Sequence, residues 1–167
     1  MSDTHHAAAG GRGFSPGGRG SRVSISFLLG ALLACSAAPP QPATLDTRHE
    51  TCGSCRMVVS DQKFAAQIVA RGEGPMFFDD LGCLARRLGK APLPEGAAIF
   101  VADHRTAEWV SAGAAVFTRV PLLDTPMGSH IIAHATEASR DADPAAQGGE
   151  HLNRSDVSPG LSKGASR

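Results

Sequence analysis

The sequence has no tyrosine and a single tryptophan, so aromatic side chains make up only 5% of its 167 residues. Its 16 basic and 16 acidic side chains cancel formally, and lysine and arginine form no block. Binding to nucleic acid through phosphate contacts needs concentrated positive charge, and the sequence argues against that function. A hydrophobic content of 42% still allows a modest core, in one domain or two very small ones.

The chain also lacks an apolar run long enough to span a bilayer. Its main apolar stretch, residues 23–34, covers about 12 residues and follows three arginines, as in the hydrophobic region of a signal peptide. The stretch ends in Leu32-Leu33-Ala34-Cys35, which resembles a bacterial lipobox. We expect residues 1–34 to be a lipoprotein signal peptide. Cys35 would then be lipidated and anchor the chain in the cell envelope, facing the periplasm, while an ordinary secretory signal is the alternative.

Cysteine is scarce, and its number is informative. If Cys35 carries lipid, the remaining cysteines are Cys52, Cys55 and Cys83. An odd number in an oxidising compartment leaves at least one thiol outside any intramolecular disulfide. This favours a metal-binding or redox role over a purely structural one.

The segment Cys52-Gly53-Ser54-Cys55-Arg56-Met57 places two thiols and one thioether within six residues. Such soft donors select Cu(I) over hard cations. Three other interpretations stay open. A structural zinc site usually needs two such cysteine pairs. A redox dithiol should open a helix, whereas Met57-Val58-Val59 favours a strand. A plain disulfide is the third.

Further candidate ligands lie later in the chain. Met127 is flanked by Pro126 and Gly128, in a predicted loop, and His130 and His134 follow it. Cys83 falls near the start of a predicted helix, which favours a thiolate, and it lies opposite the apolar face of that helix. The acidic pair at 79–80 is interpreted as a helix cap.

The predicted organisation is a small α+β fold. We expect a flexible tether at residues 35–50, a copper-binding domain at 51–140 and a disordered tail at 141–167. Strands are expected at 57–59, 64–70 and 97–102, with a short extended run at 76–78 and a helix from about 79 to 88. A weaker set of strands follows at 108–110, 115–120 and 131–133. The order strand, strand, helix, strand is visible once and its first half recurs, which suggests a degenerate internal repeat. Gln67 is expected to face outward and Trp109 to lie in the core.

Several segments in one order resemble the NosL family of nitrous oxide reductase accessory lipoproteins. They are the lipobox, Cys55-Arg56-Met57, Phe77-Phe78-Asp79-Asp80, residues 98–103, Glu108-Trp109-Val110 and Pro126-Met127-Gly128. The resemblance covers roughly residues 51–138. It implies a periplasmic, lipid-anchored Cu(I)-binding protein without catalysis, which delivers copper to nitrous oxide reductase. It also implies a fold of two degenerate ββαβ units, consistent with the incomplete repeat. Family members often have Gly where this chain has Arg56, and Cys52 and Cys83 are not general features of the family.

The leading hypothesis is therefore a Cu(I) metallochaperone that is not an enzyme. Its candidate copper ligands are Cys55, Met57, Met127, Cys52, His130 and Cys83. Its expected partners are a copper-accepting apo-enzyme and the membrane. The alternatives are a thiol–disulfide oxidoreductase that uses Cys52 and Cys55, and a structural lipoprotein stapled by a disulfide.

Overall fold

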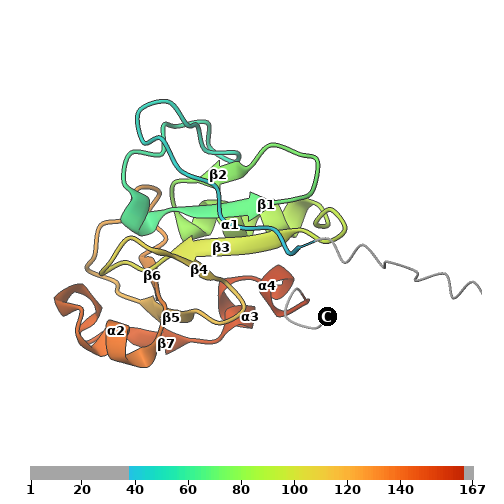
Figure 1. Cartoon of the computed structure of the whole chain (residues 1–167). Helices are drawn as coiled ribbons and strands as arrows, with labels where there is room; N and C mark the ends of the chain where they lie inside the picture. Colours follow the sequence, from blue (N-terminus) through green and yellow to red (C-terminus); the bar gives the residue numbers. More distant parts are fainter. Residues whose placement is uncertain (1–37, 164–167) are drawn as a thin grey trace, which may run out of the picture. The chain divides into compact units, whose positions relative to one another are not determined.

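A computed structural model describes residues 38–163, so the predicted signal peptide and the lipidation site Cys35 lie outside the described residues. Its strands are β1 (Ala66–Val69), β2 (Met76–Phe78), β3 (Ala98–Ala102), β4 (Trp109–Ser111), β5 (Val116–Arg119), β6 (Ile131–His134) and β7 (Glu150–Leu152). Its helices are α1 (Leu81–Lys90), α2 (Glu137–Asp141), α3 (Arg154–Val157) and α4 (Pro159–Lys163), with short 3-10 turns at Gln62–Phe64 and Pro144–Ala146. Figure 1 shows their arrangement.

Within the described residues the strands form two antiparallel sheets, in the orders β2-β1-β3-β4 and β6-β5-β7. In the first, Gln67 pairs with Phe77 and Phe100; in the second, Phe117 pairs with Ala133 and Leu152. The order β1-β2-α1-β3 along the chain recurs as β5-β6-α2-β7, and in each case the first strand lies at the centre of its three. The predicted α+β fold with two ββαβ units is confirmed.

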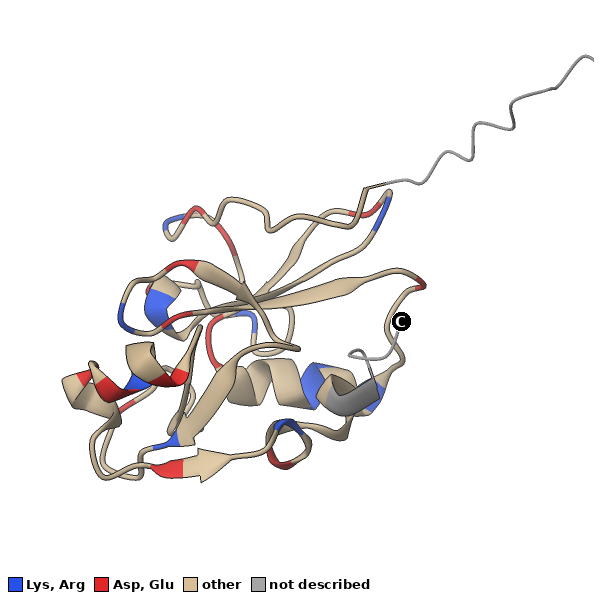
Figure 2. Ribbon diagram, turned by 60° about the horizontal axis from the view of Figure 1, so that its bottom comes forward, with Lys and Arg blue, Asp and Glu red and all other residues tan. Residues whose placement is uncertain are grey.

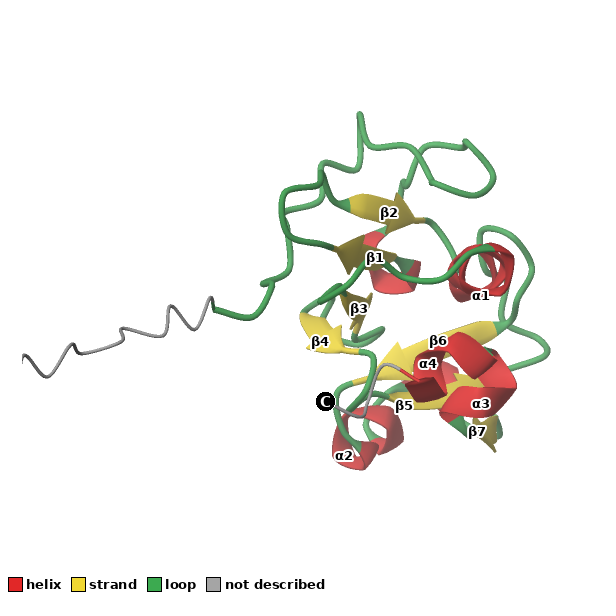
Figure 3. Ribbon diagram, turned by 90° about the vertical axis from the view of Figure 1, so that its right-hand side faces the viewer, coloured by secondary structure: helices red, strands yellow, loops and turns green. Residues whose placement is uncertain are grey.

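One hydrophobic cluster joins the two sheets. Phe78 of β2 and Val101 of β3 belong to it together with Phe117 of β5 and Leu152 of β7. Figure 3 shows the sheets as separate layers, with α1, α3 and α4 gathered on one side. Burial of this apolar surface is the main force that holds the two halves together.

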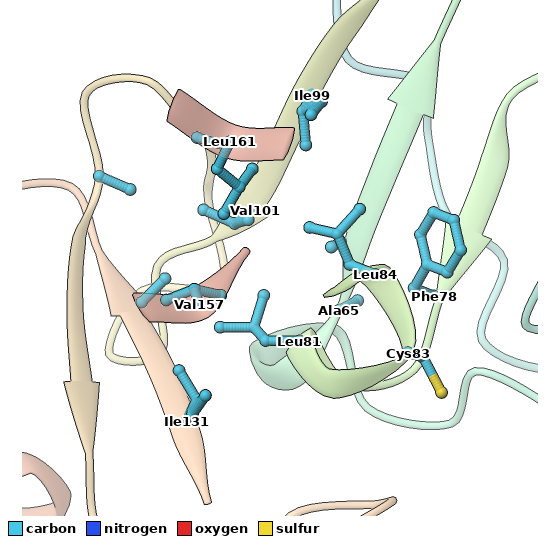
Figure 4. Packing of buried hydrophobic residues seen from close by; sticks show 14 of the residues in the cluster. Ala65, Phe78, Leu81, Cys83, Leu84, Ile99, Val101, Ile131, Val157 and Leu161 are labelled. Atoms are coloured by element: carbon cyan, nitrogen blue, oxygen red, sulfur yellow. The ribbon is translucent and has the colours of Figure 1, made fainter. Parts of the chain in front are cut away.

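Helix α1 begins where the sequence places it. The Asp80 side chain accepts a hydrogen bond of 2.6 Å from the Gly82 N–H and so caps the helix. Leu81 and Leu84 are buried, and Figure 4 shows Leu81 pointing toward Val157 while the Cys83 side chain points the other way. Cys83 is nevertheless fully buried, because the loop at 52–57 covers that face.

The two segments expected to be irregular differ from the expectation. Within the predicted tail, β7 pairs with β5, and Leu152, Val157 and Leu161 enter the core. Burial of these few apolar residues holds the short elements of this segment in place. Its polar, glycine-rich composition is typical of disordered chains, which is why the sequence predicted a disordered tail. Residues 164–167 lie outside the described part.

The segment predicted to be a tether packs against β1. Leu45 is buried, and the Gln67 amide donates to the Ala43 carbonyl and accepts from its N–H, at 3.1 and 2.8 Å. Gln67 therefore faces inward rather than outward. Trp109 is the first residue of β4. Its side chain packs against the core but remains partly exposed.

The surface of the described part agrees with the charge balance of the sequence. Figure 2 shows basic and acidic residues interspersed over the ribbon rather than gathered on one side. Among residues 38–163, no helix is both long and apolar enough to cross a membrane.

Candidate metal centre

The loop at residues 52–57 is closed on itself by backbone hydrogen bonds. The Cys52 N–H donates to the Met57 carbonyl at 2.8 Å, and the Arg56 N–H donates to the Cys52 carbonyl at 3.1 Å. The Gly53 N–H donates to the Phe77 carbonyl of β2 at 2.8 Å, which fixes the loop against the sheet. A Cβ on Gly53 would fall 2.6 Å from Cγ of Met76, so this close approach requires glycine or displacement of Met76.

This loop and α1 together form a cluster of thiols. The sulfur atoms of Cys52, Cys55 and Cys83 and a carboxylate oxygen of Asp79 all lie within 4.8 Å of one another. None of these three cysteines is in a disulfide. Cys52 and Cys83 are fully buried, whereas Cys55 is partly exposed. Three thiols at this spacing are a donor set suited to a soft cation.

Two charged side chains complete the cluster. The Cys55 thiol donates to Asp79 Oδ2 at 3.3 Å, while Asp79 Oδ1 is buried without a hydrogen-bond partner among the described residues. The Arg86 guanidinium donates to the Cys83 sulfur at 2.9 Å. An orphaned buried oxygen beside three thiols is costly in the metal-free protein and marks a place where a cation would be stabilised.

Burial favours the protonated form of two of these thiols, Cys55 and Cys83, in the metal-free protein. Desolvation raises the pKa of Cys55 and outweighs the hydrogen bond of the Met57 backbone, which lowers it; weaker contacts with Cys52 and Asp79 raise the pKa further. Desolvation also raises the pKa of Cys83, followed by contacts with Asp79 and Cys52. Because a thiolate is the form that binds metal, loading the cluster must displace protons.

The internal repeat explains why Cys52 and Cys83 meet. The loop at 103–108 has the same hydrogen bonds as the loop at 52–57: its first N–H donates to its last carbonyl at 2.8 Å, and its fifth N–H to its first carbonyl at 2.7 Å. Arg56 and Ala107, the fifth residues of the two loops, both have positive φ, of 70° and 62°. The two loops are therefore equivalent elements of the two halves.

The side chains at the equivalent positions form a polar contact in the second half. Asp103 corresponds to Cys52 as the first loop residue, and Ser139 corresponds to Cys83 as the third residue of its helix. The Ser139 hydroxyl donates to Asp103 Oδ2 at 2.7 Å. The fold thus brings this pair of positions together in both halves, and only the first half fills them with sulfur.

The two candidate thioether ligands lie at the surface. Met57 is 60% exposed and Met127 is 40% exposed. The Met127 loop is held at the start of α1, because Asp80 Oδ2 accepts from the Thr125 hydroxyl at 2.7 Å and from the Met127 N–H at 3.1 Å. Asp80 thereby ties this loop to the end of α1 that carries Cys83.

His130 is held by its own loop. Its Nδ1 lies 2.8 Å from the Leu123 carbonyl, which leaves Nε2 as the nitrogen that remains for a ligand. The residue has a φ of 58°, unusual for a residue other than glycine. The structure places it two residues past Gly128 in the same loop as Met127, where its hydrogen bonds go to Thr125 and Leu123.

His134 belongs to a different, buried cluster. Asp143 Oδ2 lies 2.6 Å from His104 Nδ1 and 2.9 Å from His134 Nε2, and all three residues are buried. A metal bound at Nε2 would leave a proton on His134 Nδ1, which is buried and has no partner among residues 38–163. Metal-ligating histidines normally donate that proton to a neighbour. The arrangement therefore fits a hydrogen-bonded network better than a metal site.

Sequence reasoning missed two members of the first cluster. It assigned Asp79 and Asp80 jointly to capping, although one cap residue is sufficient and the second acid needs another role. Arg86 gave a weaker signal, since it lies three residues after Cys83 and hence on the same helix face. Both contacts depend on the tertiary position of the loop at 52–57.

Comparisons with known proteins give one match. The protein-family model NosL matches residues 42–162, which is most of the chain and includes both ββαβ halves. No curated protein and no solved structure matches the chain. The match extends past the last residue of the resemblance noted from the motifs and covers β7, α3 and most of α4. The chain belongs to the NosL family, whose members are copper-binding accessory proteins rather than enzymes.

Proposed function

We propose that this protein is a lipid-anchored Cu(I) carrier that faces the periplasm and delivers copper to a cuproenzyme, nitrous oxide reductase. The lipid anchor would be attached at Cys35. Copper is the cargo, so the site must both hold the ion and release it to a partner. The proposal combines the family membership with the chemistry of the cluster.

The observation that carries the proposal is a cluster of three free thiols, in a loop that also carries the exposed thioether of Met57. Cys52, Cys55 and Cys83 lie within 4.8 Å of one another, and Met57 follows Cys55 by two residues on the exposed side. Thiolates and thioethers are the ligands that Cu(I) prefers. Thioethers cannot form disulfides, so they keep their affinity in an oxidising compartment.

Thiol–disulfide exchange is the rival function, and the site is poorly suited to it. An attacking cysteine needs a lowered pKa and access to its substrate. Here burial raises the pKa of Cys55, and Cys52 is fully buried. Cys55 also precedes an isolated bridge between Thr51 and Val58 rather than a helix. These features favour metal binding.

Competition with a chromophoric Cu(I) chelator tests the proposal. Cys55→Ser should weaken Cu(I) binding strongly, because a hydroxyl is a hard and weakly acidic donor. Met57→Ala should weaken it less, because a thioether is a neutral ligand. Thr106→Ser, at the position equivalent to Cys55 in the second loop, is the matched control and should bind as the unmodified protein does. Equal Cu(I) affinity for Cys55→Ser and the unmodified protein would refute this site.

A further inference from the structure

Cys52 and Cys83 are buried cysteines that a Cys-x-Met copper site does not use. The fold does not require sulfur at these two positions. In the second half the equivalent residues are Asp103 and Ser139, which are joined by a hydrogen bond of 2.7 Å. The thiols of Cys52 and Cys83 lie close to that of Cys55, and none of the three is in a disulfide. The loop therefore has three soft donors on its inner side. Their chemistry is that of a metal site.

The soft donors are graded by depth. Cys52 and Cys83 are fully buried, Cys55 is partly exposed, and Met57 and Met127 are exposed to 60% and 40%. Cys55 lies between the two groups, with its sulfur in the cluster and its loop leading directly to Met57. It is thus the natural shared ligand of an inner and an outer set.

Charge also distinguishes the two sets. Three thiolates around one Cu(I) leave a net charge of minus two in a buried place, which must be offset. The Arg86 guanidinium, 2.9 Å from the Cys83 sulfur, provides a positive charge beside one of the buried thiols, from a residue that is itself exposed. Asp79 offers only a hard oxygen, which Cu(I) does not prefer, so the sulfur atoms are the ligands.

We propose that Cu(I) rests on an inner station formed by the thiolates of Cys52, Cys55 and Cys83, and leaves it through Cys55 toward Met57 and Met127. This inference rests on the proposed copper function. Loading releases the three thiol protons to solvent. On exit the bonds from copper to Cys52 and Cys83 break, bonds to the thioethers form, and the two freed thiolates take up protons from water. Copper stays Cu(I), so no oxidant or reductant is required.

X-ray absorption at the copper edge, on the full chain loaded anaerobically with one equivalent of Cu(I), tests the inner station. The expected first shell is three sulfur atoms. Cys52→Ala and Cys83→Ala should each lower Cu(I) affinity by at least about 10–100-fold, the range that loss of even an outer partner of a metal ligand produces. Val59→Ala removes a neighbouring, fully buried side chain without sulfur and should leave affinity unchanged.

The outer thioethers should affect release more than resting affinity. Met57→Leu and Met127→Leu should keep the three-sulfur shell and weaken Cu(I) binding far less than Cys52→Ala or Cys83→Ala, but transfer copper to the chelator more slowly. Two outcomes would refute the inner station and leave the proposed function standing. In the first, Cys52→Ala and Cys83→Ala bind Cu(I) as tightly as the unmodified protein, while Cys55→Ala does not. In the second, Val59→Ala loses as much affinity as Cys52→Ala and Cys83→Ala do. If the unmodified protein binds no Cu(I), both proposals fail.

Discussion

Arg56 has a backbone conformation that favours glycine, with a φ of 70° and an exposed side chain. For a residue with a side chain, this left-handed backbone conformation costs roughly 1–2 kcal/mol of folding free energy. Glycine avoids that cost, but it loses more conformational entropy on folding, which offsets part of the gain. Arg56→Gly should therefore stabilise the protein by about 0.5–1 kcal/mol. Thermal melts of the apo-protein measure the gain. Ala107→Gly, at the equivalent position, is the matched control and should give a similar gain; a lower melting temperature for Arg56→Gly alone would show that the arginine makes a stabilising contact.

Asp103 is the carboxylate that replaces Cys52 in the second half, and its environment predicts an acid-sensitive fold. Burial alone would raise the pKa of Asp103, but donors from Ala135, Ser139, Thr106 and Arg105 outweigh burial and lower the pKa from 3.8 to about 2. Because the folded pKa lies below the unfolded one, the carboxylate stabilises the fold fully above pH 4 and loses this effect as the pH falls toward 2. Urea unfolding between pH 5 and pH 2.5 should show stability declining, and the decline should be shallower in Asp103→Asn. A slope identical to that of the unmodified protein would contradict this account.

At the scale of the element, α1 and most strands follow from local patterns, whereas the contacts between elements do not. The strand expected at 57–59 is wrong, because Val58 forms only an isolated bridge with Thr51. The run Phe64 to Ala70 predicts β1, and Asp80 followed by Leu81 and Leu84 predicts α1. The burial of Gln67 could not be inferred, because it depends on the Ala43 backbone arriving from a segment that composition describes as a tether. Cys83 was similarly placed on the polar face of its helix, and only the loop at 52–57 buries it.

The candidate site also has a part that local sequence predicts and a part that it does not. The motif at 52–57 predicts Cys52, Cys55 and Met57, because they lie within six residues of one another. The addition of Cys83 and Asp79 depends on the strand order that puts α1 behind the loop. The short elements after Asp141 were missed because three buried side chains, Leu152, Val157 and Leu161, give no periodic pattern at their spacing.

Asp80 joins two elements, and a substitution can separate its roles. One oxygen caps α1 and the other holds the Met127 loop. Asp80→Ser keeps a good N-cap but has a single oxygen that cannot serve both. Hydrogen exchange at residues 125–130 should become faster while α1 stays protected. Thr136→Ser, which keeps the N-cap of α2, is the control and should leave that loop unchanged. Unaltered exchange in the Asp80→Ser loop would show that other contacts hold it.

At the scale of the whole molecule, two equivalent halves carry different chemistry. Both place a loop residue opposite the third residue of a helix, but one half fills these positions with thiols and the other with Asp103 and Ser139. The polar pair of the second half is satisfied by its own hydrogen bond and needs no metal. Under the proposed function, copper would leave the first half without loss of this hydrogen bond in the second.

The proposed anchor is tested at the same scale by cell fractionation. The unmodified protein should partition with membranes, since acyl chains add roughly 0.8 kcal/mol per buried CH₂ and stable anchoring needs more than one chain. Cys35→Ala should release the protein or leave its leader uncleaved. Normal leader cleavage together with unchanged membrane partition would argue against lipidation at Cys35.

Native mass spectrometry of the unreduced protein, with and without Cu(I), distinguishes a copper site from a structural disulfide. The purified protein should retain the thiols of Cys52, Cys55 and Cys83 and gain the mass of one copper ion when Cu(I) is added anaerobically. The bound copper should then protect all three thiols from alkylation. A mass lower by two hydrogen atoms, with no copper bound after addition of Cu(I), would instead show a structural disulfide and contradict the account.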